Sequence, residues 1–128
     1  MYDIIIIGSG PAGLTAAIYA SRAGLRAVVV EKDTMGAGQI SVTEQVDNYP
    51  GLPHIGGYEL GEAFREHAQG MGAGFCENEV EAIAADAAGF HLTMTDGTAL
   101  SGKSVIYAAG TSYRRLSVPG SQLPGVSY

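Results

Sequence analysis

The sequence is poor in several features, and each shortage excludes a class of protein. Its 128 residues include one cysteine, Cys76, so no disulfide can form within the chain. Lys and Arg total 7 against 13 Asp and Glu. That balance argues against a nucleic-acid partner, because phosphate backbones are bound by clustered basic side chains. No apolar run approaches the roughly 18 residues of a membrane helix, so we expect no membrane partner.

Signals for export and for metal binding are also missing. No basic segment precedes the first apolar run, and Gly8 interrupts that run early, which argues against a signal peptide. His54, His67 and His91 lie far apart and lack cysteine or carboxylate partners at ligand spacing. With 46% apolar and 16% charged residues the composition is globular. We therefore expect a cytoplasmic protein without a metal site.

The first 31 residues predict a strand, a helix and a second strand. Asp3 to Ile7 is a β-branched run without alternation, which is typical of a parallel strand buried on both faces. A helix is expected over Pro11 to Ala23, because proline is tolerated at the first helical position, and Gly24 follows as its cap. Ala27 to Val30 then forms a buried strand that ends at Glu31. This unit has the size of a right-handed crossover.

The remainder predicts a loop, a helix and further strands. Lys32 to Pro53 has no period and is long for a connection, and such loops are usually functional. A helix is expected over Gly57 to Gly72. Strands are expected over Gly74 to Glu77, Val80 to Ala85, Phe90 to Thr95, Thr98 to Leu100 and Ser104 to Ala108. We interpret the second to fourth of these as an antiparallel meander with a hairpin turn at Asp96–Gly97, and the last as a buried strand.

Three glycines follow the first strand directly. Gly8, Gly10 and Gly13 match G-x-G-x-x-G between a strand and a helix. The first allows a tight exit from the strand, the second lets a pyrophosphate approach the main chain, and the third lets the helix pack closely. Free N–H groups at the helix start would hold the phosphates without any lysine, with Ala12 and Gly13 as the donor candidates. An ordinary tight turn remains the alternative.

Glu31 strengthens this interpretation. It lies at the tip of the second strand, about where the motif's ribose-binding acid is expected, roughly 20 residues beyond the glycines. A carboxylate there accepts hydrogen bonds from ribose hydroxyls, although a charged strand end facing water is the plainer alternative. Together the motif and the acid predict an adenine dinucleotide, and they leave open whether it is FAD or NAD.

Several longer stretches then coincide in order. They are DIIIIGSGPAGLTAAIYASRAGL, GAGQI, TEQVDNYPGLP, CENEVEAI and VIYAAGTSYRRL. The chain resembles the N-terminal, FAD-binding part of low-molecular-weight thioredoxin reductases, and also the alkyl hydroperoxide reductase flavoprotein subunit. The resemblance implies an α/β, Rossmann-like FAD/NAD(P)-binding domain with a parallel sheet and a small antiparallel meander, incomplete at its C-terminal end. It places this domain at residues 1–112 and a linker toward an absent NAD(P)H-binding domain at residues 113–128.

The resemblance also assigns FAD-binding residues. They are Gly8, Ser9, Gly10, Pro11, Ala12 and Gly13 around the pyrophosphate, Glu31 and Lys32 near the adenosine ribose, Gly38 and Gln39 near the ribityl–flavin region, Thr43 and Asn48 beside the flavin, Val80 holding adenine through its main chain, and Ala109, Gly110 and Thr111 closing over the dinucleotide. Gln39 is alternatively a solvated amide, Asn48 the cap of a turn and Thr43 bonded to its own backbone. No catalytic residue is assigned.

Two departures from the family pattern stand at this site. The usual Gly-Gly-Gln is Ala37-Gly38-Gln39 here, and the usual Ala-Thr-Gly is Ala108-Ala109-Gly110. Both keep the glycine beside the cofactor. The second loses a hydroxyl, and with it any hydrogen bond that the family's threonine makes there.

By the same resemblance, the parent protein passes a hydride from NADPH to FAD and reduces a disulfide, and thereby a thioredoxin-like partner, usually as a homodimer. Lone Cys76 cannot form the dithiol pair that this exchange requires, so the chain alone is expected to be inactive. Three alternatives stay open: the FAD half of a ferredoxin–NADP reductase or dithiol oxidase of the same family, an NAD-binding module without flavin, and a non-catalytic interaction domain.

Overall fold

The computed structural model describes residues 1–33 and 36–126. Its elements are β1 (Tyr2–Ile7), α1 (Pro11–Arg22), β2 (Ala27–Glu31), the short 3-10 helix η1 (Gly38–Val42), α2 (Gly57–Gly70), β3 (Gly74–Glu77), β4 (Val80–Asp86), β5 (Gly89–Met94) and β6 (Ala99–Tyr107). The six strands form one sheet in the order β3-β2-β1-β6-β5-β4. Strands β3, β2, β1 and β6 are parallel, and β5 runs antiparallel to β6 and β4. The predicted α/β, Rossmann-like class is confirmed.

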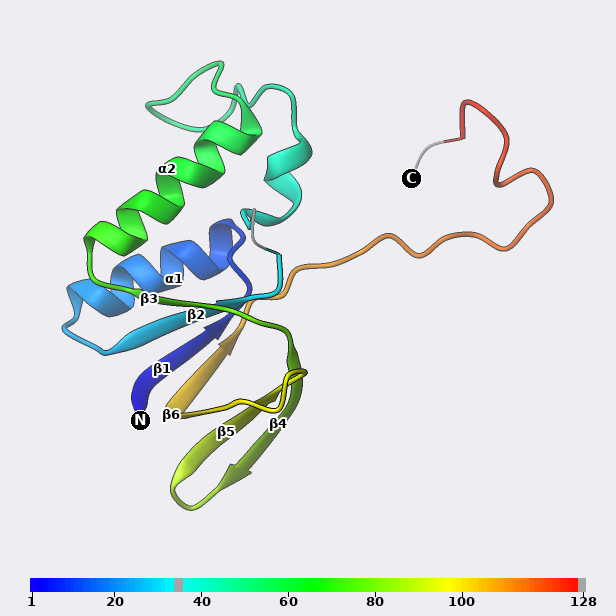
Figure 1. Ribbon diagram of the computed structural model, residues 1–128. Coiled ribbons are helices and arrows are strands. Elements are labelled where there is room, and N and C mark those ends of the chain that lie inside the picture. The colour runs from blue at the N-terminus through cyan, green and yellow to red at the C-terminus, as the bar shows by residue number, and fades with distance from the viewer. Residues whose placement is uncertain (34–35, 127–128) are drawn as a thin grey trace.

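Strand β1 is buried on both faces, as its unbroken apolar run predicts. Ile5 points to one face and Ile6 to the other, and each is 0% exposed. The first face packs against Leu92 and Met94 of β5, and the second against α1 and α2 through residues such as Leu14. The two helices lie together on one side of the parallel strands, while β4 and β5 turn away from them (Figure 1). Burial on both faces therefore requires the meander as well as the helices.

Strand β6 differs from the prediction. Thr98 to Leu100 and Ser104 to Ala108 were expected as separate strands, but one continuous strand covers Ala99–Tyr107. Its first part pairs with β5 and its second part with β1, and Gly102 belongs to both ladders. A Cβ at Gly102 would lie 2.8 Å from Cγ1 of Ile5. The glycine therefore permits close packing of the two halves, where the sequence pattern indicated a break.

The expectation that this last strand is buried is also wrong in part. Val105 packs into the core beside Ile5, but Ile106 is 36% exposed and Tyr107 is 74% exposed. The helices contact mainly η1, each other, β2 and β1, which leaves the helix side of β6 poorly covered at Ile106. Tyr107 is paired with Ile7 and lies on the other face of the sheet.

Beyond β6 the chain extends away from the sheet. Residues 108–117 have no regular structure, residues 118–125 form turns and bends, and most of this tail is exposed (Figure 1). The predicted linker 113–128 begins within this tail, and its last two residues, like 34–35 of the predicted loop, lie outside the described residues. In the described part of the chain, no helix is long and apolar enough to cross a membrane.

Candidate functional site

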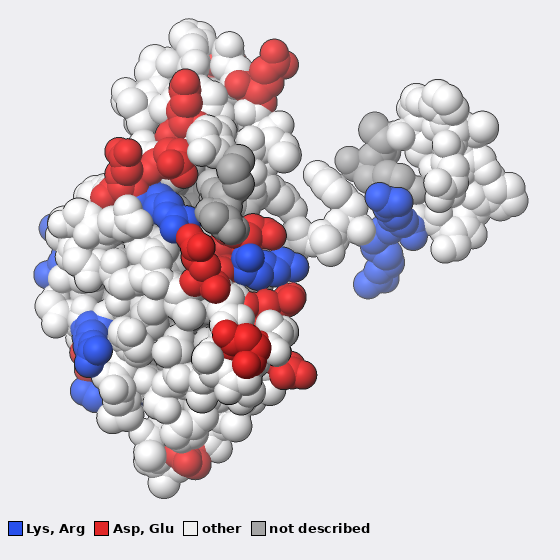
Figure 2. Space-filling view, in the orientation of Figure 1, with Lys and Arg blue, Asp and Glu red and all other residues white. Residues whose placement is uncertain are grey.

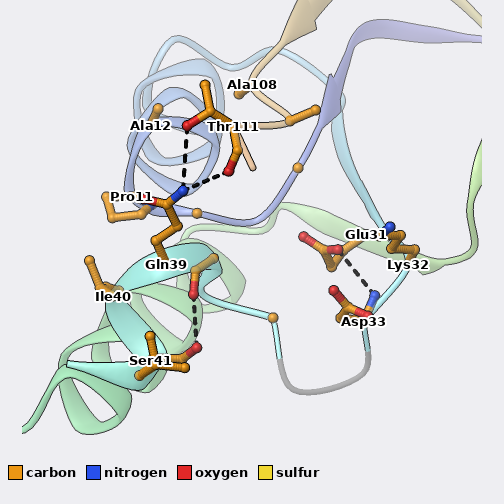
Figure 3. A pocket seen from close by; sticks show the side chains of 17 residues that line it. Pro11, Ala12, Glu31, Lys32, Asp33, Gln39, Ile40, Ser41, Ala108 and Thr111 are labelled. Atoms are coloured by element: carbon orange, nitrogen blue, oxygen red, sulfur yellow. Dashed lines mark hydrogen bonds between the residues drawn. The ribbon is translucent and has the colours of Figure 1, made fainter. Parts of the chain in front are cut away.

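A cleft of about 1070 Å³ lies where β1, β2 and β6 end. Its lining comes from four segments: Gly8, Gly10, Pro11 and Ala12; Glu31, Lys32 and Asp33; Gly36 and residues 38–42; and Ala108 to Thr111. The chain leaves β1 toward β2 on one side, and β6 lies on the other. Ligands of open parallel sheets bind at such switch points, outside the carboxyl ends of the strands. Figure 3 shows these segments converging from separate parts of the sequence.

Helix α1 begins at the floor of this cleft. Gly10 is its N-cap and no side chain caps it, while Pro11 occupies the first turn, which carries no acidic residue. The first N–H groups of a helix have no partner within the helix, and they carry the positive end of its dipole. Since Gly10, Pro11 and Ala12 line the cleft, these donors favour an anionic ligand there.

The glycines of the motif act as their spacing predicts. Gly8 leaves β1 with φ of 101°, a conformation that side chains disfavour, and a Cβ there would meet the carbonyl of Ala108. Gly13 packs directly on the turn, because a Cβ would meet the carbonyl of Gly8. At Gly10, by contrast, a Cβ would lie 3.9 Å from Cα of Gly38, which is an ordinary contact. Thus Gly8 and Gly13 are required by the fold itself, whereas contacts within the described residues do not demand glycine at position 10.

Glu31 reaches this turn from the end of β2. One carboxylate oxygen, Oε2, accepts hydrogen bonds from the Ser9 N–H and O–H, each at 2.8 Å. The other, Oε1, accepts one from the Asp33 N–H at 3.1 Å. Partial burial raises the pKa of the Glu31 carboxyl, but these hydrogen bonds outweigh it and hold the pKa below its ordinary value. The group is therefore an ionised acceptor at neutral pH.

A second cleft of about 400 Å³ adjoins the first. It is lined by Ile7, Gly8, Val30 to Lys32, Asn78 to Ile83, Tyr107 and Ala109. Glu31 lines both clefts, so it lies between Val80, the predicted adenine contact, and the start of α1. Lys32 is paired with Glu79 at 3.7 Å, and both are exposed.

The far wall of the larger cleft is a run of left-handed residues. Gly36, Ala37 and Gly38 have φ of 53°, 67° and 62°. Ala37 is one of the two departures from the family pattern, and a left-handed alanine costs about 1 kcal/mol. Its methyl is buried against α2, and its N–H donates to Oγ of Ser9 at 3.3 Å. These contacts hold the segment in place before η1.

Gln39 bridges the mouth of the cleft. Its Nε2 donates to the carbonyl of Thr111 at 2.6 Å, and it lies 3.4 Å from the Thr111 hydroxyl (Figure 3). Both residues are exposed. The predicted flavin contact and the predicted closing segment therefore meet each other across the site.

The structure brings most of the predicted residues together. Those lining one of the two clefts are Gly8, Gly10, Pro11, Ala12, Glu31, Lys32, Gly38, Gln39, Val80, Ala109, Gly110 and Thr111. Ser9 and Gly13 are buried beneath them. Thr43 and Asn48 are exposed in the loop beyond η1, outside both linings, and the Thr43 carbonyl accepts from the Gly57 N–H at 3.0 Å. Asp33, Gly36 and Ile40 to Val42 line the cleft and were not predicted; neither spacing nor residue type marks them.

Charge around the site is mixed. Figure 2 shows acidic side chains gathered across the middle of the view, with basic ones among them, and the basic side chains of the tail apart from both. Within residues 1–33 and 36–126, no group of three or more His, Cys, Asp or Glu side chains is placed to hold a metal ion. An anion in the larger cleft would therefore meet the main-chain N–H groups at the start of α1 and no cluster of basic side chains among the described lining residues.

Comparison with known proteins places these features in a family. Residues 2–127 match the family model described as pyridine nucleotide-disulphide oxidoreductase. Thioredoxin reductase of Bacillus subtilis is 40% identical over 131 residues, which span 100% of this chain and 41% of that protein. NADPH-dependent thioredoxin reductase 3 of Arabidopsis thaliana is 43% identical over 121 residues, spanning 91% of this chain and 23% of the relative.

The fold gives the same result. The crystal structure of Lactococcus lactis thioredoxin reductase superposes with a TM-score of 0.87 at 35% identity, covering 94% of this chain and 39% of that one. Thioredoxin reductase of T. acidophilum superposes with a TM-score of 0.85 at 33% identity, covering 93% and 38%. The chain thus spans about two fifths of the length of the Bacillus relative. With its glycine turn, its acid and its cleft, it belongs to the pyridine nucleotide-disulphide oxidoreductase family and is homologous to thioredoxin reductases.

Proposed function

We propose that this chain binds FAD, extended across the two clefts. Adenine would lie beside Val80 in the smaller cleft and the adenosine ribose at Glu31. The pyrophosphate would lie on the first turn of α1, and the flavin toward Gln39 and Thr111. One observation carries the proposal: the uncapped start of α1 forms the floor of a large cleft, with an ionised carboxylate on the adjoining strand end.

The residues present fit this cofactor. Gly10 lines the cleft, and a Cβ there would meet only Cα of Gly38 and the carbonyl of Ala37, at ordinary contact distance. Main-chain N–H groups of the first helical turn suit a diphosphate, and the Glu31 carboxylate suits ribose hydroxyls. When bound, FAD supplies two-electron redox chemistry, while the protein binds and orients it.

For the whole protein we propose an NADPH-dependent thioredoxin reductase, which passes electrons through FAD to a disulfide and on to a thioredoxin-like partner. The relatives' names support this, and the protein is then expected to be a cytoplasmic homodimer. The 128 residues contain only Cys76, which is exposed in part and has no cysteine to pair with. Reduction of a disulfide substrate by these residues alone is therefore not expected.

Cofactor binding is tested by titrating the purified chain with FAD and following flavin fluorescence. We expect saturable binding, and we expect the Gly10→Val variant to bind at least tenfold more weakly, because its side chain would occupy the pyrophosphate position. A matched control is Gly70→Val at the exposed end of α2, where a Cβ meets nothing within 4 Å. Binding of NAD but not FAD would identify a nicotinamide module and overturn the proposal.

The inactivity of the chain alone is tested with NADPH, FAD and thioredoxin. We expect no steady oxidation of NADPH that depends on thioredoxin. Sustained, protein-dependent turnover would show that these residues reduce disulfides by a route that needs no cysteine pair.

A further inference from the structure

Ser9 occupies an unusual position in the glycine motif. It stands between Gly8 and Gly10, which line the cleft, yet it is 1% exposed. Within residues 1–33 and 36–126 it is the one polar residue that is buried. Buried hydroxyls need hydrogen-bond partners. The Ser9 hydroxyl has two, on different segments: it donates to Oε2 of Glu31 at 2.8 Å and accepts from the Ala37 N–H at 3.3 Å.

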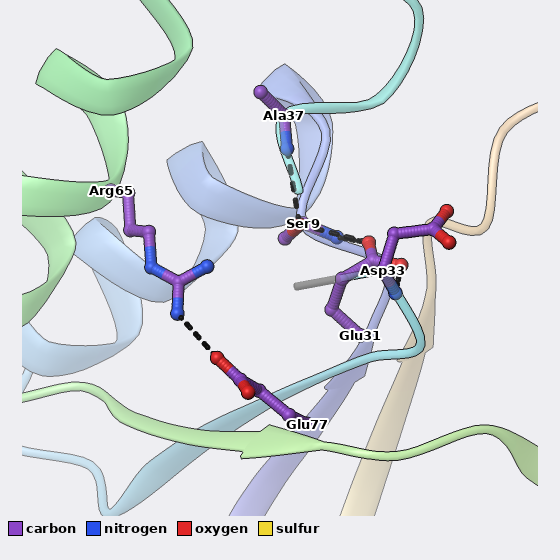
Figure 4. Close-up of polar contacts among 6 residues, drawn as sticks. All are labelled: Ser9, Glu31, Asp33, Ala37, Arg65 and Glu77. Atoms are coloured by element: carbon purple, nitrogen blue, oxygen red, sulfur yellow. Dashed lines mark hydrogen bonds and ion pairs between the residues drawn. The ribbon is translucent and has the colours of Figure 1, made fainter. Parts of the chain in front are cut away.

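These bonds connect three walls of the site. Figure 4 shows Ser9 between the Glu31 carboxylate and Ala37, with Asp33 on the other side of the carboxylate. The Ser9 hydroxyl also packs against the left-handed segment, because a Cβ at Gly36 would lie 2.7 Å from it. One side chain of the turn after β1 thus contacts both the acid at the end of β2 and the segment before η1.

We infer that Ser9 is a positioning residue: its buried hydroxyl orients the Glu31 carboxylate toward the ribose and fixes the Gly36–Ala37 wall, without contacting the cofactor itself. This inference rests on the proposed FAD site. The Ser9 side chain lines neither cleft and bonds to Glu31 and Ala37 instead, so the expected place of Ser9 around the pyrophosphate stays a prediction for its main chain.

The test is a cycle of variants measured by FAD binding: Ser9→Ala, Glu31→Gln and the double variant. If Ser9 acts through Glu31, we expect Ser9→Ala to weaken binding about tenfold in the original chain and by less than threefold in the Glu31→Gln background. Equal losses in both backgrounds would overturn the inference that Ser9 acts through Glu31, and would leave FAD binding itself intact.

A matched control is available in α1. Ser21 carries a hydroxyl that is buried with no hydrogen-bond partner found among the described residues. The Ser21→Ala substitution therefore removes the same atom without removing a bond, and FAD affinity should stay within twofold. A comparable loss in this variant would mean that the effect at Ser9 is a general one of packing, and would overturn the inference.

A second measurement needs no ligand, and so separates failure of this inference from failure of FAD binding. The carboxyl carbon of Glu31, followed by NMR against pH, should titrate at higher pH in Ser9→Ala, because the carboxylate loses a donor. The charged groups around it, namely Lys32 with its partner Glu79, Asp33 and the Arg65–Glu77 pair, are unchanged by this substitution. An unchanged Glu31 titration would overturn the positioning role even if FAD binds. A shifted titration in a chain that does not bind FAD would overturn the proposed function alone.

Discussion

Gly61 of α2 lies directly against the methyl group of Ala37, so closely that a Cβ at position 61 would overlap it. Ala37 holds the left-handed conformation in the cleft wall, with φ of 67°. The helix and the cleft wall are therefore complementary at this pair, with the alanine on the loop and the glycine on the helix.

This pairing predicts that a stability loss caused by a substitution at Gly61 is recovered by a substitution at Ala37. Gly61→Ala should lower the free energy of unfolding by about 2 kcal/mol, because overpacking outweighs the better helix propensity of alanine. Adding Ala37→Gly should restore most of the loss, since the next atom, Cα of residue 37, is 3.6 Å away and a left-handed glycine is unstrained. Urea unfolding of the two single variants and the double variant measures this.

Gly70→Ala in the same helix is the control, because a Cβ there meets nothing within 4 Å. It should leave stability unchanged or raise it by up to about 1 kcal/mol. A double variant no more stable than Gly61→Ala would show that the cleft wall and α2 do not meet in this way.

Acid should destabilise the fold partly through Glu31. Its pKa is lowered in the folded state, so its contribution to stability is fully present at neutral pH and is lost as the pH falls below roughly 4.3. Asp3, Asp86 and Asp96 also have lowered pKa values, so the informative quantity is the difference in free energy of unfolding between the original chain and the Glu31→Gln variant. Urea unfolding from pH 7 to pH 3 should show this difference becoming smaller. A difference that stays constant with pH would contradict the assigned hydrogen bonds.

The bridge across the cleft should restrain the segment after β6. Gln39→Ala removes the donor to the Thr111 carbonyl, so backbone NMR order parameters of residues 109–112 should fall. Thr111→Ala keeps the main-chain acceptor, and its order parameters should stay close to those of the original chain. An equal loss of order in both variants would show that the threonine hydroxyl, at 3.4 Å, is the partner that matters.

Cys76 should be a poor nucleophile in the folded protein. Burial, and then the charge of Asp96, raise the pKa of its thiol, and the side chain packs against the core. At pH 8 a disulfide reagent should therefore modify it at least tenfold more slowly in the native state than in urea. Similar rates in the two states would mean that β3 is frayed in solution.

Much of the fold follows from patterns in the sequence. The apolar run of β1, Pro11 at the helix start and the Asp96–Gly97 turn each report a local requirement, and each was predicted correctly. The union of two predicted strands into β6 was missed because Gly102 indicates a break locally. Its actual reason, contact with Ile5, depends on a strand about a hundred residues earlier.

The candidate site also contains residues that local sequence patterns reveal and residues that they do not. Spacing alone located the glycine turn and Glu31, because their placement follows from local chain geometry within one strand–helix–strand unit. The role of Ser9 could not be read from the sequence, since its partners Glu31 and Ala37 come from separate segments. The short helix η1 was also missed, because five residues carry no detectable period.

The continuity of strand β6 also bears on how the two clefts are placed relative to each other. One unbroken strand takes part in both the parallel ladder and the meander, and both clefts are lined by residues at or just after its end. The meander that carries Val80 is therefore held in register with β1, which leads into the glycine turn. A slip of a single residue of β6 against β1 would turn Val105 out of the core and shift Val80 relative to the start of α1.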